Sequence, residues 1–514
     1  MIPGGILLPI GKQDWLKEEG AAFPGRTYAE VVLAPAFDQA KAELLLPMMT
    51  VNKAHLIMLR EQGLVSDSDA ERIAAALESL DLAALQQSAY TGQFEDLFFQ
   101  VEHGLLEHAG DAAGNLHLAR SRNDMGIAIY RLVLREKLLE TIGSALLLHE
   151  RLLFFAGEHT ETVMLGYTHT QQAQPTTMAH YIAAVSDSLG RDLRRLKAAF
   201  ANCNRSSMGA AALTTSGFAV SRERMAELLA FDGLIDNAYD AVSGADYVGE
   251  IAAAVQLAAI NLGRFVQELL LWSTQEFAVL HVAPPYVQIS SIMPQKRNPV
   301  SIEHMRSLLS SCAGDAQTVL TMIHNTPFGD IVDTEDDLQP YAWKSLRTLE
   351  SVYRLLGCVI GTLEINKEGL RARAEASFAT VTELADTLVR TESLSFRTAH
   401  TIVSRVVKEA VSRGLSASGL ELEALNRAAG EIIGRDLALD EEELRRSLDP
   451  SWFVAIRRLH GGPNPEEVLR ALQHQRFRQE SDEAWLQERR EAIRTARQYV
   501  DTTIARWGVP QNQS

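Results

Sequence analysis

Apolar residues recur at spacings of three and four over long parts of the chain, which is the period of an amphipathic helix. One such stripe runs through Met178, Ile182, Leu189, Leu196 and Phe200. A stripe of this kind is expected to face neighbouring helices. The pattern predicts a mainly α-helical protein.

Prolines divide the chain into long stretches that favour helix. None occurs at 48–174, 176–283 or 341–449, and these ranges are rich in Ala, Leu, Glu and Arg. Pro175 comes shortly before the apolar stripe and is expected to open that helix, because proline is tolerated in a first turn. The sequence contains no run of alternating strands.

Residues 245–282 are apolar nearly all round. Their only Asp, Glu, Lys or Arg residues are Asp246, Glu250, Arg264, Glu268 and Glu276. A helix without a polar face must be surrounded by other helices. This segment is therefore predicted to lie at the centre of a long-helix bundle that subunits can share.

The length of 514 residues suggests about three domains, at about 150 residues each. We predict an N-terminal helical domain at 1–117, a central long-helix bundle at 118–377 and a small C-terminal helical domain at 378–514. The SDSD segment at 66–69 is expected to cap a helix at 70–80. Residues 479–506 are expected to form a charged helix with one docked face, and residues 510–514 a disordered tail.

Composition narrows the class of protein. The chain is 46% hydrophobic with a net charge of -17, which argues against nucleic-acid binding but not against a small anionic substrate. Its three cysteines form neither a disulfide framework nor a metal pattern, so we expect no metal and a reducing cytoplasm. Residues 1–8 lack the features of a signal peptide, and no apolar run reaches the length of a membrane span.

The chemistry concentrates in a loop with the sequence SSIMPQKRNP at 290–299. Its prolines disfavour helix, and a helical pattern restarts after Pro299. Lys296 and the N-terminus of that helix can place positive potential beside Ser290, which would make its hydroxyl a base or nucleophile. A generic loop of this composition would more often be a polar surface loop.

This loop resembles the signature of the fumarase/aspartase superfamily, GSSxMPxKxNP, with Ile289 in place of the leading glycine. Two further segments, RSRND at 120–124 and GYTHTQQAQP at 166–175, resemble motifs of its argininosuccinate lyase branch. Taken alone, the first could be a capped helix start with solvated arginines, and the second could hold an ordinary loop histidine. Together the resemblance covers most of the chain.

The resemblance implies a mainly α fold, a central bundle and a homotetramer whose sites each combine motifs from three subunits. It implies that Ser290 takes a proton, that His169 pairs with Glu303, and that Lys296 stabilises the developing charge. The residues implied to hold the substrate are Ser121, Arg122, Asn123, Thr168, Gln171, Ser291 and Asn298. No redox step occurs, so no cofactor is expected.

The chain departs from the family pattern where the family holds the amine end of its substrate. Val51 and Asn52 stand where a Gly-Ser pair is usual, and 329–337 keeps acids but lacks the usual Tyr, Lys and Gln. The expected reaction is elimination of fumarate from an N-substituted aspartate, with argininosuccinate the first candidate. Another such substrate, for example ethylenediamine-disuccinate, is the alternative, and an inactive crystallin-like member is the rival outside enzymes.

Overall fold

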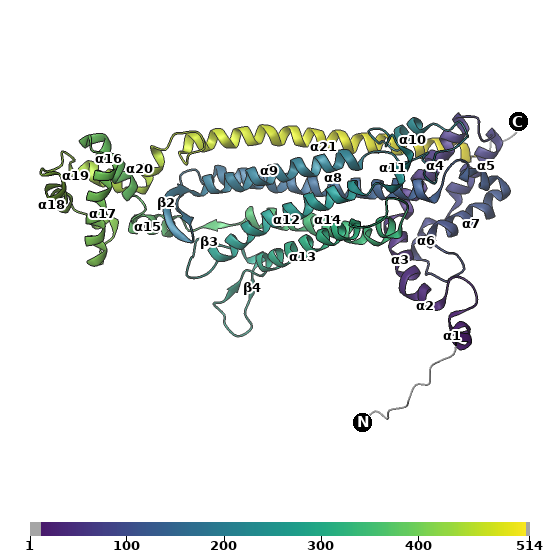
Figure 1. Cartoon of the computed structure of the whole chain (residues 1–514), viewed down its shortest axis with the longest axis horizontal. Helices are drawn as coiled ribbons and strands as arrows, with labels where there is room; N and C mark the ends of the chain where they lie inside the picture. Colours follow the sequence, from purple (N-terminus) through teal and green to yellow (C-terminus); the bar gives the residue numbers. More distant parts are fainter. Residues whose placement is uncertain (1–11, 510–514) are drawn as a thin grey trace, which may run out of the picture.

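The computed structural model describes residues 12–509 and confirms the mainly α-helical fold. Long helices lie side by side along one axis, with a cluster of shorter helices at each end (Figure 1). The expectations for residues 1–8 and 510–514 fall outside the described residues.

Five long helices form the central bundle. They are α8 (Arg122–Gly157), α9 (Met178–Cys203), α12 (Asp246–Trp272), α13 (Val300–Ile323) and α14 (Gln339–Ile360). Helix α12 packs against α9, α13 and α14. Leu257 and Ile260 on its remaining face are exposed, so the helix is not surrounded within one chain as predicted. Its end was predicted wrongly, because α12 stops at Trp272 and not near residue 282. Ser273 follows the helix and donates its hydroxyl to the carbonyl of Leu270 at 2.8 Å. The chain then continues to β3 (Leu280–His281).

Residues 37–116 contribute most of a second hydrophobic core at one end of the bundle, around the largely buried α4. The predicted cap at 66–69 is confirmed: Ser66 accepts the N–H of Asp69 at 3.1 Å, and α5 begins at Asp67 and not at residue 70. The elements of this region are α1 (Lys12–Glu19), α2 (Arg26–Tyr28), η1 (Ala29–Leu33), α3 (Ala34–Glu43), α4 (Leu45–Glu61), α5 (Asp67–Ser79), α6 (Leu82–Gln87), α7 (Leu97–Ala109) and η2 (Gly110–His117).

A third core lies at the opposite end of the molecule. Its small helices follow the bundle in sequence. They are α16 (Val381–Glu392), α17 (Phe396–Ser412), η5 (Ala417–Gly419), α18 (Leu422–Ile433) and α19 (Glu441–Leu448). Helices α15 (Lys367–Ala376) and α20 (Pro450–Ala455) flank them in the sequence.

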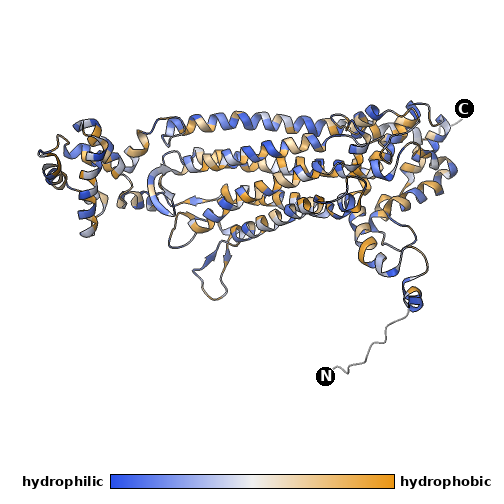
Figure 2. Ribbon diagram, in the orientation of Figure 1, coloured by the Kyte–Doolittle hydropathy of each residue, from blue (hydrophilic) through white to orange (hydrophobic). Residues whose placement is uncertain are grey.

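The last helix, α21 (Pro465–Gly508), runs back along the whole bundle and is much longer than the predicted 479–506 (Figure 1). Asn464 caps it by accepting the N–H of Glu466 at 3.0 Å, and Pro465 occupies a first-turn position. Its exposed face is largely hydrophilic (Figure 2). Leu486 joins the central core, whereas Val500 and Ile504 join the N-terminal core. The three domain ranges stay predictions, and α21 links two of the cores.

Short antiparallel strand pairs lie in the segments that connect the helices. The helical pattern did not predict them. Strands β1 (Val163–Thr168) and β2 (Gln171–Thr177) form a hairpin, and Pro175 lies inside β2 opposite Leu165. The prediction that Pro175 opens α9 was therefore wrong: the helix begins at Met178, capped by Thr177, which accepts the N–H of His180 at 3.1 Å. The remaining short elements are β4 (Gln288–Ile289), β5 (Arg297–Asn298), β6 (Glu364–Ile365), η3 (Pro284–Tyr286), η4 (Asp333–Asp337), α10 (Arg222–Leu228) and α11 (Ala238–Ser243).

The docking of α21 generates a stability prediction. Ile504 is fully buried in the N-terminal core, so Ile504→Ala should lower the free energy of unfolding by about 2–5 kcal/mol. Leu469→Ala on the same helix is the control, because Leu469 is 44% exposed. Urea unfolding should show a clear drop for the first variant only. Equal midpoints would mean that the end of α21 does not stabilise the N-terminal core.

Candidate active site

Two of the three sequence motifs, the RSRND segment and the His169 hairpin, lie far apart on one chain. The RSRND segment is at the start of α8, and the hairpin that carries His169 follows the end of the same helix. A helix of 36 residues rises about 54 Å. The two motifs therefore lie near opposite ends of the bundle (Figure 1).

At the start of α8, Ser121 and Asp124 form a capping box. The Ser121 hydroxyl donates to the Asn123 side-chain oxygen at 2.5 Å. Arg122 is exposed and donates to Asp96 at 2.9 Å, while the Asn123 amide donates to Asp330. The segment is thus a capped helix start, and the guanidinium of Arg122 still has N–H groups free to bind an anion.

Behind this segment, the first arginine of the motif points into the protein. Arg120 donates to the side-chain oxygen of Asn52 at 2.7 Å, and Asn52 is buried. Burial lowers the pKa of Arg120 to about 10. Burial and the charge of Arg120 lower the pKa of His117 to about 4. Asn52, which stands where the family usually has a Gly-Ser pair, therefore holds the Arg120 side chain inside the protein.

The acid-rich segment at 330–337 folds against the same end of α8. Tyr130 donates its hydroxyl to Asp336 at 2.5 Å, and Asn123 contacts Asp330. Burial, together with the neighbouring Asp330, raises the pKa of Glu335 to about 9. At neutral pH this carboxyl keeps its proton, so the acids beside Asn123 carry less negative charge than their number suggests.

His169 lies at the turn of the β1–β2 hairpin. His169 and Thr170 adopt positive φ angles of 51° and 61°, and the side chains of Thr168, His169 and Gln171 are exposed. Glu303 is exposed on the first turn of α13. Among the described residues of one chain, His169 and Glu303 form no ion pair, so their predicted pairing stays a prediction.

The signature loop projects from the bundle as a narrow ribbon between β4 and β5 (Figure 1). Ser290 accepts the N–H groups of Ile292 at 3.3 Å and Met293 at 3.1 Å. Lys296 is exposed, and its backbone N–H donates to the carbonyl of Met293 at 3.0 Å. Within this part of the chain the Lys296 ammonium makes no hydrogen bond to Ser290. Ser291 is exposed and Asn298 is partly buried.

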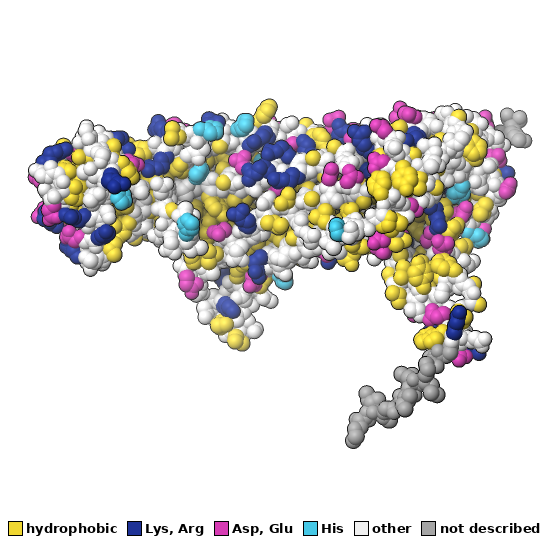
Figure 3. All heavy atoms as spheres, in the orientation of Figure 1, with side chains coloured by type: hydrophobic (Ala, Val, Ile, Leu, Met, Phe, Trp, Pro, Cys, Tyr) yellow, Lys and Arg dark blue, Asp and Glu magenta, His cyan; other side chains and the backbone are white. Residues whose placement is uncertain are grey.

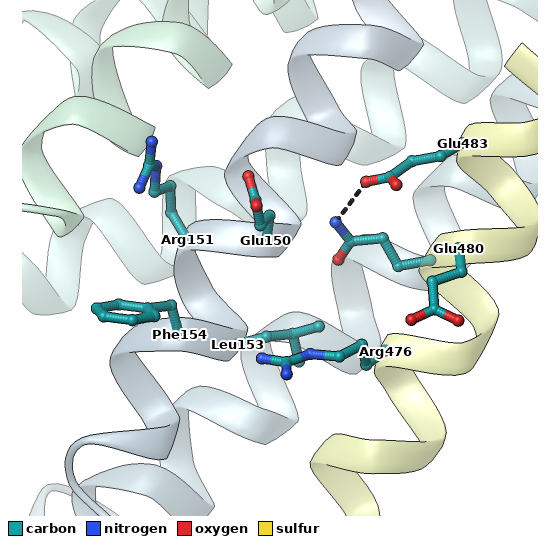
Figure 4. Close-up of a pocket in the computed structure, with 8 residues that line it drawn as sticks. Glu150, Arg151, Leu153, Phe154, Arg476, Glu480 and Glu483 are labelled. Atoms are coloured by element: carbon teal, nitrogen blue, oxygen red, sulfur yellow. Dashed lines mark hydrogen bonds between the residues drawn. The ribbon is translucent and has the colours of Figure 1, made fainter. Parts of the chain in front are cut away.

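A cavity of 330 Å³ between α8 and α21 holds none of these residues (Figure 4). Its lining mixes Glu150, Glu480 and Glu483 with Arg151 and Arg476. In residues 12–509 no three or more His, Cys, Asp or Glu side chains are placed to bind a metal ion together. Nor does any helix there combine the length and the apolar character of a membrane span.

Comparisons with known proteins decide the family. The chain matches a family model described as "Lyase" over residues 61–314 and one described as "Argininosuccinate lyase C-terminal" over 378–455. It is 38% identical to argininosuccinate lyase 2 of Agrobacterium fabrum over 95% of this chain and 99% of that protein. The chain belongs to the argininosuccinate lyase branch of the fumarase/aspartase superfamily. As a member of this branch it is a carbon–nitrogen lyase.

Two further relatives of this lyase agree. Argininosuccinate lyase 1 of Shouchella clausii is 34% identical over 88% of this chain and 91% of its own length. The crystal structure of EDDS lyase in complex with formate superposes with a TM-score of 0.84 at 31% identity, covering 93% of this chain and 96% of that one.

Sequence reasoning missed a loop beside the RSRND segment. The carboxylate of Asp124 accepts the N–H groups of Gly209 and Ala211 at 2.9 and 3.0 Å and thereby ties residues 209–217 to the start of α8. Burial raises the pKa of Asp124 to about 6, against the opposing effect of these bonds. The only signal in the sequence was a run of small and hydroxyl residues around Gly209.

The protonated Glu335 generates a pH prediction. Its folded-state pKa of about 9 lies above the ordinary value of 4.5, so its contribution to stability is fully present below pH 4.5 and is lost as the pH rises toward 9. Glu335→Gln should therefore be more stable than the parent protein at pH 8, and the difference should shrink toward pH 5. Thermal unfolding across this range measures it, with exposed Glu276→Gln as the control. A pH-independent difference would contradict the assignment.

Proposed function

We propose that this lyase splits argininosuccinate into arginine and fumarate, in the cytoplasm, as a homotetramer with shared active sites. The family membership and the relatives named for argininosuccinate cleavage support the substrate. The observation that carries the shared site is the separation of the motifs: the donors at the start of α8 and the His169 hairpin cannot meet on one chain without unfolding α8.

The surface of the bundle supports assembly. Leu257 and Ile260 of α12 and Leu308 of α13 are 44%, 50% and 41% exposed, although these helices form the core of the bundle. Hydrophobic side chains reach the surface of the bundle in Figure 3. Apolar surface on long central helices is what a second copy would cover. Side-by-side copies in opposite directions would bring motifs from opposite ends together.

In the proposed reaction, Ser290 removes the proton from the carbon next to a substrate carboxylate. The electron pair forms the double bond of fumarate as the carbon–nitrogen bond breaks, and the nitrogen leaves with a proton. His169, oriented by Glu303 of another subunit, supplies that proton through water. Lys296 and Asn298 stabilise the doubly charged carboxylate that develops before the bond breaks.

The remaining predicted residues hold the substrate. Arg122, Asn123 and Ser121 are proposed to hold its carboxylates, with Thr168, Gln171 and Ser291 as the other contacts. Arg122 suits a carboxylate because its guanidinium can donate two parallel hydrogen bonds.

Ethylenediamine-disuccinate is the second candidate substrate. The similarity to EDDS lyase supports it, and so does the acid-rich segment at 330–337, where the family would place Tyr, Lys and Gln. Acidic side chains favour a cationic amine, and both arginine and ethylenediamine are cationic. A crystallin-like loss of activity is disfavoured because Ser290, Lys296, Asn298, His169 and Glu303 are all present.

Ser290→Ala should abolish fumarate formation, because it removes the proposed base, while the oligomer and its thermal stability stay unchanged. The ultraviolet absorbance of fumarate measures turnover, and Ser418→Ala on an exposed turn is the control. A variant with near-parental turnover would move the role of the base to another group, with Ser291 the next candidate.

The reverse reaction identifies the amine. With fumarate in excess, the enzyme should add arginine, because a site built for one leaving group leaves polar groups unpaired with another. Arginine, ethylenediamine and ammonia are compared by chromatography of the products. Efficient addition of ethylenediamine without arginine would replace the first substrate by the second.

A further inference from the structure

We propose that the loop at 209–217 is a fourth substrate-binding segment, positioned by Asp124, and that its hydroxyl and N–H groups bind a substrate carboxylate beside Arg122. This inference rests on the proposed function and extends it to residues that no sequence motif covers.

The first support is the way in which Asp124 holds the loop. The side chain is fully buried, and three backbone N–H groups donate to its carboxylate, from Ser121 at 2.9 Å and from Gly209 and Ala211 in the loop. Its backbone carbonyl also accepts the hydroxyl of Ser207 at 2.7 Å. A single residue of the RSRND motif therefore fixes both the helix start and the loop.

A second residue supports the loop from the other side. Arg222 donates to the carbonyls of Met208 at 3.1 Å and Ile235 at 2.8 Å. A Cβ atom at Gly209 would lie 2.6 Å from the Cγ of Arg222, and Gly209 has a φ of +82°. This close approach and positive φ explain why glycine is needed there.

The loop itself has an unusual backbone. Ala211, Leu213 and Thr215 have positive φ angles of 52°, 119° and 62°, alternating with residues of negative φ. Such backbone is strained and persists only when its surroundings impose it. Alternation of this kind can turn successive N–H groups toward one concave side, where they bind anions. Two of these N–H groups already bind the carboxylate of Asp124.

The outer part of the loop is open to a ligand. Ala212, Thr214 and Thr215 are exposed. Within the described chain, the N–H groups of Ala212 and Thr214 donate to no acceptor. The hydroxyls of Thr214 and Ser216 lie on the same stretch. These groups are suited to a carboxylate because all can donate hydrogen bonds.

The neighbours of the loop place it at the proposed site. Helix α11 packs beneath it through Ala241 and Val242. Tyr239 of the same helix stacks on Phe328, with ring centroids 6.0 Å apart. Phe328 is two residues before Asp330, the partner of Asn123. The loop, α11 and the acid-rich segment are thus connected to one another, and they border the start of α8 at Asn123 and Asp124.

The test uses variants at the exposed tip. Thr214→Val and Ser216→Ala remove hydroxyls without touching the support from Asp124 and Arg222. Each variant alone should raise the KM for argininosuccinate about tenfold, the effect of one lost hydrogen bond to a charged group, and leave kcat within about twofold. Thr401→Val on α17 is the matched control. An unchanged KM would overturn the proposal.

Asp124→Asn tests the positioning role. Its amide nitrogen would face N–H donors, so the loop should detach, and hydrogen exchange at Gly209 and Ala211 should accelerate together with a rise in KM. Parental exchange or parental KM in a folded variant would contradict the role of Asp124, and failure of this variant to fold leaves the tip variants as the test. If the parental enzyme does not cleave argininosuccinate at all, the proposed function fails, and direct binding of fumarate to the parent and tip variants then tests the loop.

Discussion

The length of α8 constrains everything that this chain can do alone. A continuous helix of 36 residues separates the donors at its start from the His169 hairpin beyond its end, and it is buried along most of its length by α9 and α14. Bending it to join the two would expose the central hydrophobic core, whose burial is the main favourable contribution to folding. A site that needs both ends must therefore combine copies of the chain.

The rigidity of α8 also fixes the position of the donors at its first turn. Ser121 and Asp124 close the first turn of α8, and the backbone around them is held by Asn52 through Arg120 and by the loop at 209–217. By contrast, the ribbon with Ser290 projects from the bundle and contacts it little. This is expected of a segment that closes over a substrate held partly by residues of other subunits. This arrangement suits the proposed reaction, in which a base removes a weakly acidic proton while fixed donors stabilise the negative charge that develops on the substrate.

Much of the fold could be predicted from the sequence because helical periodicity and capping are local. The stripe of α9 and the cap at 66–69 follow from residue type and spacing. The errors arose where tertiary contacts override local signals. Pro175 was predicted to open a helix but pairs with Leu165 in a hairpin, and the helix predicted at 479–506 already begins at Pro465, where Asn464 caps it. Of the site, the three motifs were found through their resemblance to the family signatures, because their residues alone left a surface loop, a capped helix start and a loop histidine open. The loop at 209–217 was not found, because Asp124 reaches it across 85 positions of the chain.

The central claim is that the active site combines motifs of different chains. It is tested most directly by mixing two inactive variants, Ser290→Ala and His169→Asn, after mild dissociation and reassembly. Hybrid oligomers should contain some sites that carry neither substitution, so fumarate formation should return to a fraction of the parental rate. Reassembled mixtures that contain both variants in one oligomer and remain inactive would contradict the shared site.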